Sequence, residues 1–293
     1  MNEPVINSAM NSITDDWATV LATYTDHLTA GGRSPRTIRL RSYWLIRFAK
    51  AHTQGPWGVE PADITAWASS LTCAAETRRS IRSTLMSFYR WSIDAGNISV
   101  NPARTLLPIK APRAIPKPTP EPVLERALQE SSTRDRLMVR LGAQAGLRRE
   151  EIAWSEWTWI EGQWLRVMGK GGHERLVPLV PDLAAELRRE RRLRERGEVS
   201  DGWRFAPDPT SPYIFPGRAG GHISEETVGA ILKRVLVTHS GHTLRHRFGT
   251  RVLRGSHDIR ATQELLGHAS VLTTQRYTAV EDEDLMTAVA WAA

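Results

Sequence analysis

Five prolines in one short segment constrain the fold of this chain more than any other feature. The segment from residue 104 to residue 120 contains Pro108, Pro112, Pro116, Pro118 and Pro120. Proline fixes φ and has no N–H to donate, so this density excludes a helix or a central strand. We interpret the segment as a stiff, extended linker and as the natural domain boundary. Its cations could contact DNA phosphates, with a plain spacer as the alternative; they are Lys110, Arg113 and Lys117.

The chain length of 293 residues suits two ordinary domains, one on each side of this linker. The expected divisions are an N-terminal extension at 1–11, a helical domain at 12–103, the linker at 104–120 and a second domain at 121–293, with a tail from about 282. No stretch approaches the ~20 apolar residues of a membrane span, and the N-terminus lacks the order of a signal peptide. We therefore expect a cytoplasmic protein without a membrane span.

The composition bears on partners and on redox chemistry. There are 39 basic and 32 acidic residues, which gives a net charge of +7 and a pI near 10.0. Such a balance favours a nucleic-acid partner, although an ordinary basic protein also fits it. The single cysteine, Cys73, excludes a disulfide framework and a cysteine-based metal site, and we expect it to be a buried thiol.

Apolar residues at three- and four-residue spacing predict four helices in the N-terminal domain. The first ends at Gly31-Gly32. Ser34 is a suitable N-cap for the second, with proline next to it at the first helical position. The third opens at Pro61 and the fourth runs over about 74–93. The polar faces of the second and fourth helices carry the DNA-binding candidates, with a merely solvated face as the alternative; these are Arg36, Arg39, Arg78 and Arg82.

The second domain combines helices with three short β-type runs. The runs span 157–160, 164–168 and 175–180, with a hairpin signal at Glu161-Gly162. A helix precedes Gly146 and another begins at Arg148. A third helix begins at Pro181, and we expect its charged run, 186–196, to be an exposed face.

The C-terminal third of the chain is predicted to be helical. Ser224 is a suitable N-cap for a helix through Leu236, whose Lys233 and Arg234 are further DNA-binding candidates. Three more short helices follow, broken near Gly255 and Gly267. The expected fold class is therefore mainly α with a small antiparallel β-sheet.

Six of the nine histidines lie within residues 222–268. One explanation is a metal site, because His242 and His246 are four residues apart on a predicted helix. However, Arg245 and Arg247 would repel a divalent cation, so we expect no metal. A site for an anion is the other explanation, because arginines accompany the histidines.

Four motifs resemble those of the tyrosine recombinase (phage integrase) family, in the family's order. They are the first arginine box at 145–151, the β-hairpin lysine box at 169–178, the second box at 242–246, and the last at 265–268 followed by 273–277. The N-terminal region, with 76–79, 88–91 and Asn101-Pro102, is similar to the family's core-binding domain. The resemblance covers about residues 12–280 and implies a SAM-like helical core-binding domain followed by an α+β catalytic domain.

The resemblance also implies cleavage of a phosphodiester by transesterification. Arg148 and Arg245 would clamp the non-bridging oxygens, where charge develops. Tyr277 would attack the phosphorus, and Lys170 would protonate the departing 5′ oxygen. Glu151 would support the arginine clamp, with a simple helix salt bridge as the alternative.

The roles of the two remaining catalytic candidates stay open. His242 is a candidate base and His268 a second phosphate donor. Because the bond energy is stored in a 3′-phosphotyrosyl link, we expect no metal, ATP or other cofactor. The sequence departs from the family pattern at Ala279, where a histidine is common, and at Gly249, where alanine is usual.

The partners implied are double-stranded DNA with specific core sites and further copies of the chain. We expect a homotetramer on paired sites, a monomer or dimer off DNA, and a possible accessory protein for DNA bending or directionality, in a bacterial host. An arm-binding domain has no room before residue 12, so we expect action on short core sites only. The tail, 282–293, could dock on a neighbouring protomer or act as a degradation signal.

Integration and excision of a mobile, phage-like element is the function we expect first. A Xer-type resolvase of chromosome dimers would use the same chemistry. A catalytically silent DNA-binding relative is disfavoured because the six catalytic candidates are intact. A type IB topoisomerase would need no paired specific site, and a metal-dependent nuclease would lose its activity in chelator.

Overall fold

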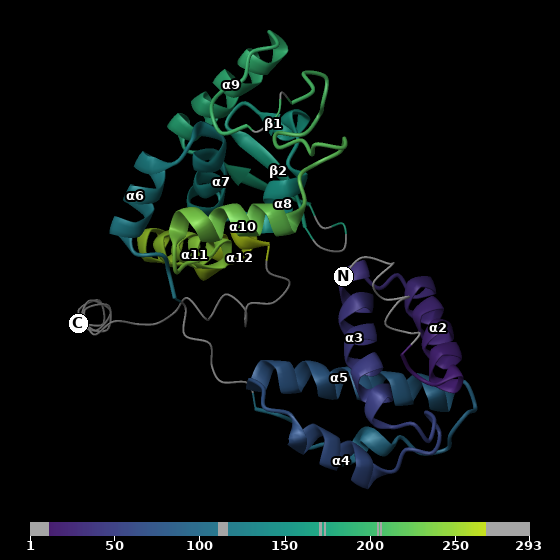
Figure 1. The fold of residues 1–293 in the computed structure, drawn as a ribbon. Coiled ribbons are helices and arrows are strands. Elements are labelled where there is room, and N and C mark those ends of the chain that lie inside the picture. The colour runs from purple at the N-terminus through teal and green to yellow at the C-terminus, as the bar shows by residue number, and fades with distance from the viewer. Residues whose placement is uncertain are drawn as a thin grey trace, which may run out of the picture. The chain divides into compact units, whose positions relative to one another are not determined.

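The computed structural model describes residues 12–110, 117–169, 172, 174–203, 205 and 207–267. The chain separates into two compact units, Met1–Arg113 and Ala114–Ala293, and the division falls within the proline-rich segment. Figure 1 shows the helices and strands of each unit. In the described part of the chain, no helix combines the length and the apolar character that crossing a bilayer requires.

The N-terminal unit is helical, and its four predicted helices are confirmed. They are α2 (Asp15–Ala30), α3 (Pro35–Ala51), α4 (Pro61–Ser70) and α5 (Ala75–Asp94), followed by a 3₁₀ turn at Pro102–Thr105. Helix α3 packs against α2 and α5, and the 3₁₀ turn packs against α4 and α5. Aromatic rings fill the core between them, and the largest fully buried ones are Trp17, Tyr24, Phe48, Phe88 and Tyr89.

The start of α3 shows how the sequence sets a helix boundary. The Ser34 side chain accepts a hydrogen bond from the Thr37 N–H at 3.3 Å, and Pro35 occupies the first helical position. This satisfies an N–H that has no partner within the helix, so the predicted cap is confirmed. The expectation of a buried Cys73 was wrong, because this side chain is only half-buried. It lies at the edge of the core, on the short connection that leads into α5.

The second unit contains seven described α-helices and a three-stranded antiparallel sheet in the order β1–β2–β3. The helices are α6 (Glu121–Glu130), α7 (Thr133–Gln144), α8 (Arg149–Trp154), α9 (Pro181–Glu195), α10 (Glu225–Leu236), α11 (Gly241–Ser256) and α12 (Ile259–Leu266). The strands are β1 (Ile160–Glu161), β2 (Trp164–Met168) and β3 (Glu174–Pro178). Helix α7 contacts α6, α8, α9, α10 and α11 (Figure 1). The predicted fold class, mainly α with a small antiparallel sheet, is confirmed.

Two strand predictions need correction. The run 157–160 is mostly a 3₁₀ turn, Trp157–Trp159, and only its last residue belongs to β1. The reason is a competing partner, since the Trp157 N–H donates to the Pro212 carbonyl at 2.9 Å instead of to a strand. The third strand ends at Pro178 and not at Val180, because Val180 is already the N-cap of α9.

The charged run on α9 is not simply an exposed face. Glu190 and Arg194 are buried, and Arg194 donates to the carbonyls of Tyr213 and Ile214 in the loop that follows α9. Burial lowers the pKa of Arg194 to about 10, against the opposing charge of Glu190. The charge pattern alone did not show that this loop folds back over the helix.

The helices after this loop begin and end close to the predicted positions. Ser224 caps α10 as predicted, and its Oγ accepts from the Thr227 N–H at 3.1 Å. Helix α11 ends at Ser256 and α12 begins at Ile259, so the predicted break near Gly255 is confirmed within two residues. Helix α12 ends at Gly267, where the backbone is left-handed with φ +59°, as a C-terminal glycine allows. The third of the short helices expected here lies outside the described residues.

Candidate active site

A glycine turn brings the start of α8 close to α11. Gly146 has φ +66°, and a Cβ atom there would lie 2.4 Å from Cδ1 of Phe248. Only glycine permits both the left-handed backbone and this close approach. The chain then passes to Arg148, the N-cap of α8. The turn thus places the first arginine box against the helix that carries the second.

Glu151 is the centre of the site, and its side chain is only 1% exposed. One carboxylate oxygen accepts from the Arg148 backbone N–H at 2.8 Å, and the other accepts from the Arg148 guanidinium at 2.7 Å. A buried charge requires such compensation. Glu151 therefore orients Arg148, whose side chain is 34% exposed and remains accessible from solvent.

A second guanidinium, from Arg175 on β3, binds the same carboxylate. Its two terminal nitrogens donate to the two Glu151 oxygens at 2.9 and 2.8 Å, and its Nε donates to the Leu265 carbonyl at 2.9 Å. Arg175 is not among the site residues predicted from the sequence. One signal was present, because strand alternation puts Arg175 on the same side of β3 as the buried Val177. A cation on the buried side of a strand requires a partner.

Arg245 on α11 completes the cluster. Its Nη1 lies 3.8 Å from a Glu151 oxygen, and the side chain is 3% exposed. The guanidinium also donates to the carbonyls of Gly146 and Leu266. The structure thus brings together Arg148, Arg245 and Glu151, as the family resemblance implied, and adds Arg175.

The electrostatic balance of the cluster is positive. Burial by itself would raise the pKa of Glu151, but hydrogen bonds and charge from Arg175, the Arg148 N–H and the charge of Arg245 lower it to about 2. The carboxylate is therefore ionised at neutral pH. Three guanidinium groups face one carboxylate, and the excess of positive charge suits an anion such as a phosphodiester.

His242 lies in the first turn of α11, and its side chain is exposed. Its ring centroid is 4.2 Å from that of His246. The turn is attached to the C-terminal end of the linker. The Thr119 N–H donates to the Thr243 carbonyl at 3.1 Å, and the two threonine hydroxyls are 2.7 Å apart. The remaining catalytic candidates, Lys170, His268 and Tyr277, lie outside the described residues.

The DNA-binding candidates of the N-terminal unit differ in what they contact. Arg78 donates to the carbonyls of Ala68 and Leu71, and Arg82 donates to the Leu106 carbonyl. These contacts connect α5 to the segments around it. On α3, Arg36 is exposed and Arg39 is half-buried.

The other DNA-binding candidates lie within the linker or on α10. Lys110 and Lys117 are exposed, and Arg113 lies outside the described residues. On α10, Lys233 is exposed, and Arg234 forms an ion pair with Asp135.

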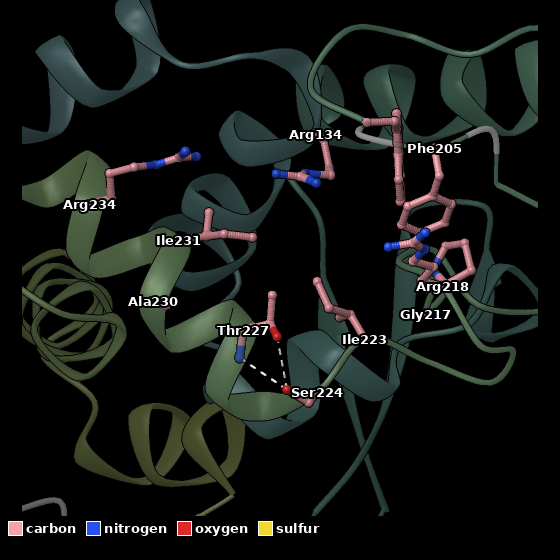
Figure 2. Close-up of a pocket in the computed structure, with 12 residues that line it drawn as sticks. Arg134, Phe205, Gly217, Arg218, Ile223, Ser224, Thr227, Ala230, Ile231 and Arg234 are labelled. Carbon is pink, nitrogen blue, oxygen red and sulfur yellow. Dashed lines mark hydrogen bonds between the residues drawn. The ribbon is translucent and has the colours of Figure 1, made fainter.

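A cavity of about 590 Å³ lies beside α10, and no member of the arginine cluster lines it. Figure 2 shows the residues that do. Arg134 and Arg234 line it and share the Asp135 carboxylate, and Arg134 also stacks on Trp203. None of the predicted catalytic residues that are described lines this cavity. Among the described residues, no group of three or more histidine, cysteine or acidic side chains is placed to hold a metal ion.

Comparison with known proteins identifies relatives that match most of the chain. The model of the phage integrase family matches residues 120–284. Tyrosine recombinase XerC of Xanthomonas axonopodis pv. citri is 33% identical over 233 residues, covering 72% of this chain and 72% of the relative. Tyrosine recombinase XerD of Caulobacter vibrioides is 35% identical over 233 residues, covering 74% of each. A solved structure of a lambda integrase dimer bound to a COC′ core site is also similar. The match covers 94% of this chain and 81% of the integrase chain, with a TM-score of 0.70 at 18% identity, and it supports the assignment of the fold.

Proposed function

The chain belongs to the phage integrase family of tyrosine recombinases, and from that membership we propose that it cuts and rejoins DNA through Tyr277. The family makes it a site-specific recombinase. The assignment of individual residues is our proposal, as is the division into a core-binding domain at 12–103, the linker and a catalytic domain from 121.

One observation carries the proposal: Arg148 and Arg245 both form ion pairs with the Glu151 carboxylate. The two arginines come from α8 and α11, far apart in the sequence, and contact one carboxylate. Charge that develops on non-bridging phosphate oxygens is stabilised by fixed guanidinium donors that need no reorganisation. Buried Glu151 supplies that fixation. The cluster therefore supports a phosphate site at this point.

The proposed reaction conserves the number of phosphoester bonds. The Tyr277 oxygen attacks the phosphorus, the bond to the 5′ oxygen breaks, and a 3′-phosphotyrosyl link forms. His242 or His268 accepts the phenol proton, and Lys170 supplies a proton to the departing 5′ oxygen. Attack on the link by a 5′ hydroxyl of the partner duplex reverses these steps. No external energy source is needed, because one ester replaces another.

The names of the relatives favour a role as a Xer-type resolvase over a role in the integration and excision of a mobile element. The two curated relatives described above are a XerC and a XerD. We propose that the chain resolves dimers of a circular chromosome by recombining two copies of a host site, as an assembly of four protomers on paired sites. Integration and excision of a mobile element, the function expected first from the sequence, is the other outcome of the test below.

The test uses nicked suicide substrates that trap the covalent intermediate. One duplex carries the host's chromosome-resolution site and a second carries the sequence that flanks this gene. We expect a protein–DNA adduct with wild type, none with Tyr277→Phe, and at least about a 100-fold slower adduct with Arg148→Lys, because a lysine cannot donate in a paired geometry. Tyr213→Phe is the matched control. Tyr213 lies in the loop after α9, so this variant should form the adduct at the wild-type rate.

The two substrates separate the biological roles. Adducts on the host site support a resolvase, and adducts on the gene-flanking site support integration. Cleavage that requires neither sequence supports a topoisomerase, and cleavage that stops in chelator supports a nuclease. An adduct that persists in Tyr277→Phe contradicts the proposal.

A further inference from the structure

Arg175 joins two parts of the catalytic unit that the proposed reaction must align. On one side its guanidinium forms two hydrogen bonds to Glu151, at 2.9 and 2.8 Å. On the other side its Nε donates to the Leu265 carbonyl at 2.9 Å. The side chain is 7% exposed, so these contacts are shielded from water. A single guanidinium therefore links β3, the start of α8 and the end of α12.

The next carbonyl on α12 is bound by the same cluster. The Leu266 carbonyl accepts from Arg245, which lies 3.8 Å from the Glu151 carboxylate. The last carbonyls of a helix have no partner within it and carry a negative partial charge, so cations there are favourable. Two successive carbonyls at the end of α12 are thus fixed by two guanidiniums that share one carboxylate.

The chain leaves α12 directly over the Arg175 side chain. At Gly267, with φ +59°, a Cβ atom would lie 2.9 Å from Cδ of Arg175. The approach is close enough that only glycine fits without a shift. In the sequence, His268 follows at once and Tyr277 comes nine residues later.

We propose that Arg175 is a positioning residue for strand cleavage, an inference that rests on the proposed function. Arg175 acts through two groups and does not itself contact the phosphate. It keeps Glu151 ionised and oriented, so that Arg148 is presented correctly. It also fixes the exit of α12, from which the chain continues to His268 and Tyr277.

The test separates positioning from stability with Arg175→Lys, which keeps the charge but loses the bidentate geometry. The matched control is Arg166→Lys on neighbouring β2, an exposed arginine paired with Glu161 at the surface. We measure the dissociation constant for the uncleaved site, and the single-turnover rate and final amplitude of the phosphotyrosyl adduct at saturating protein.

We expect Arg175→Lys to bind DNA within about twofold of wild type and to cleave about 100-fold more slowly, because small displacements of reacting groups cost this much. Arg166→Lys should match wild type in both. A purely structural role lowers the adduct amplitude by reducing the folded fraction while the rate stays unchanged. That result, or a wild-type rate in Arg175→Lys, overturns the inference.

A second variant decides the case in which Arg175→Lys does not fold. Gly267→Ala keeps every charge but pushes on the Arg175 side chain, and Gly162→Ala is its control, with φ +62° and open space around the added Cβ. We expect slow cleavage in the first and a normal rate in the second; equal rates in both overturn the inference. Absence of any adduct with wild-type protein contradicts the proposed function instead.

Discussion

At the scale of single residues, the site depends on one buried carboxylate. Glu151 is surrounded by three arginines from three different elements. Removing one partner of a buried ion pair costs more than the pair contributes, because it leaves a charge uncompensated in the interior. Substitutions here should therefore affect stability as well as catalysis, and the two have to be measured separately.

The first prediction concerns the pH dependence of folding. The pKa of Glu151 falls from 4.5 to about 2 on folding. A lowered pKa stabilises the folded state above the unfolded value, and this stability is lost as the pH falls from 4.5 toward 2. The two values differ by 2.5, so the contribution at pH 7 is of order 3 kcal/mol.

Urea unfolding of wild type and Glu151→Gln at several pH values checks this prediction. Glutamine does not titrate, so the gap in unfolding free energy between the two proteins should be largest near pH 7 and shrink below pH 4.5. A gap that stays constant with pH would mean that the pKa of Glu151 does not change on folding.

The second prediction concerns the turn before Arg148. Gly146→Ala introduces both a left-handed alanine and a contact of 2.4 Å with Phe248, whereas Gly162→Ala introduces only the backbone strain. We expect a loss of about 1 kcal/mol for Gly162→Ala and roughly 3 kcal/mol or more for Gly146→Ala, because overpacking adds to the strain. Thermal or chemical unfolding measures both. Equal losses would show that the α7–α8 turn does not pack against α11 as described.

The sequence predicted part of this site and not the rest, for a physical reason. Arg148, Glu151 and Arg245 stand in motifs whose order and spacing resemble a known family, so they could be selected without coordinates. Arg175 stands in one of the same motifs, but its role depends on which carboxylate and which carbonyl it meets. Strand alternation indicates the side that Arg175 faces, while its partners come from α8 and α12 and can be found only in the folded chain.

At the scale of helices and strands, local chemistry predicted the boundaries well where a cap decided them. Ser34 and Ser224 cap α3 and α10 through their own hydroxyls, using only residues within the next turn. The predictions were wrong where a segment distant in the sequence supplied the hydrogen-bond partner. Pro212 takes the N–H of Trp157, and the loop after α9 covers Arg194. Neither contact has a signal within the local sequence.

The third prediction concerns α12, a short helix with both ends fixed. The Asp258 side chain accepts from the N–H groups of Arg260 and Ala261 at 2.7 and 3.0 Å. Asp258→Ala should cost about 1 kcal/mol and loosen the helix, and Asp258→Asn should retain most of the stability because asparagine caps equally well. Amide hydrogen exchange across 259–266 and the single-turnover cleavage rate check this. Faster exchange in Asp258→Asn than in Asp258→Ala would contradict the capping argument.

At the scale of the whole molecule, each unit has a hydrophobic core of its own and carries its own exposed cations. The net charge of +7 favours DNA, but individual arginines differ in what they are available for. The Arg78 guanidinium donates hydrogen bonds to two backbone carbonyls, whereas Lys233 is exposed on α10. Substitution of Arg78 should therefore lower the stability of the N-terminal unit, while substitution of Lys233 should act on DNA affinity.

The fourth prediction follows from this distinction and uses salt dependence to count phosphate contacts. Each cation that neutralises a phosphate contributes about 0.9 to the slope of log affinity against log salt concentration. Arg39→Gln on α3 and Lys233→Gln on α10 should each reduce that slope by about this amount, and the double variant by about twice as much, since the two cations belong to different units. Arg191→Gln on α9 is the control, because Arg191 pairs with Glu195 at 3.0 Å and should leave the slope unchanged. Fluorescence anisotropy with a core-site duplex at several salt concentrations provides the slopes. If the double variant keeps the wild-type slope, neither face contacts the DNA backbone, and the binding surface must then include other cations of the two units.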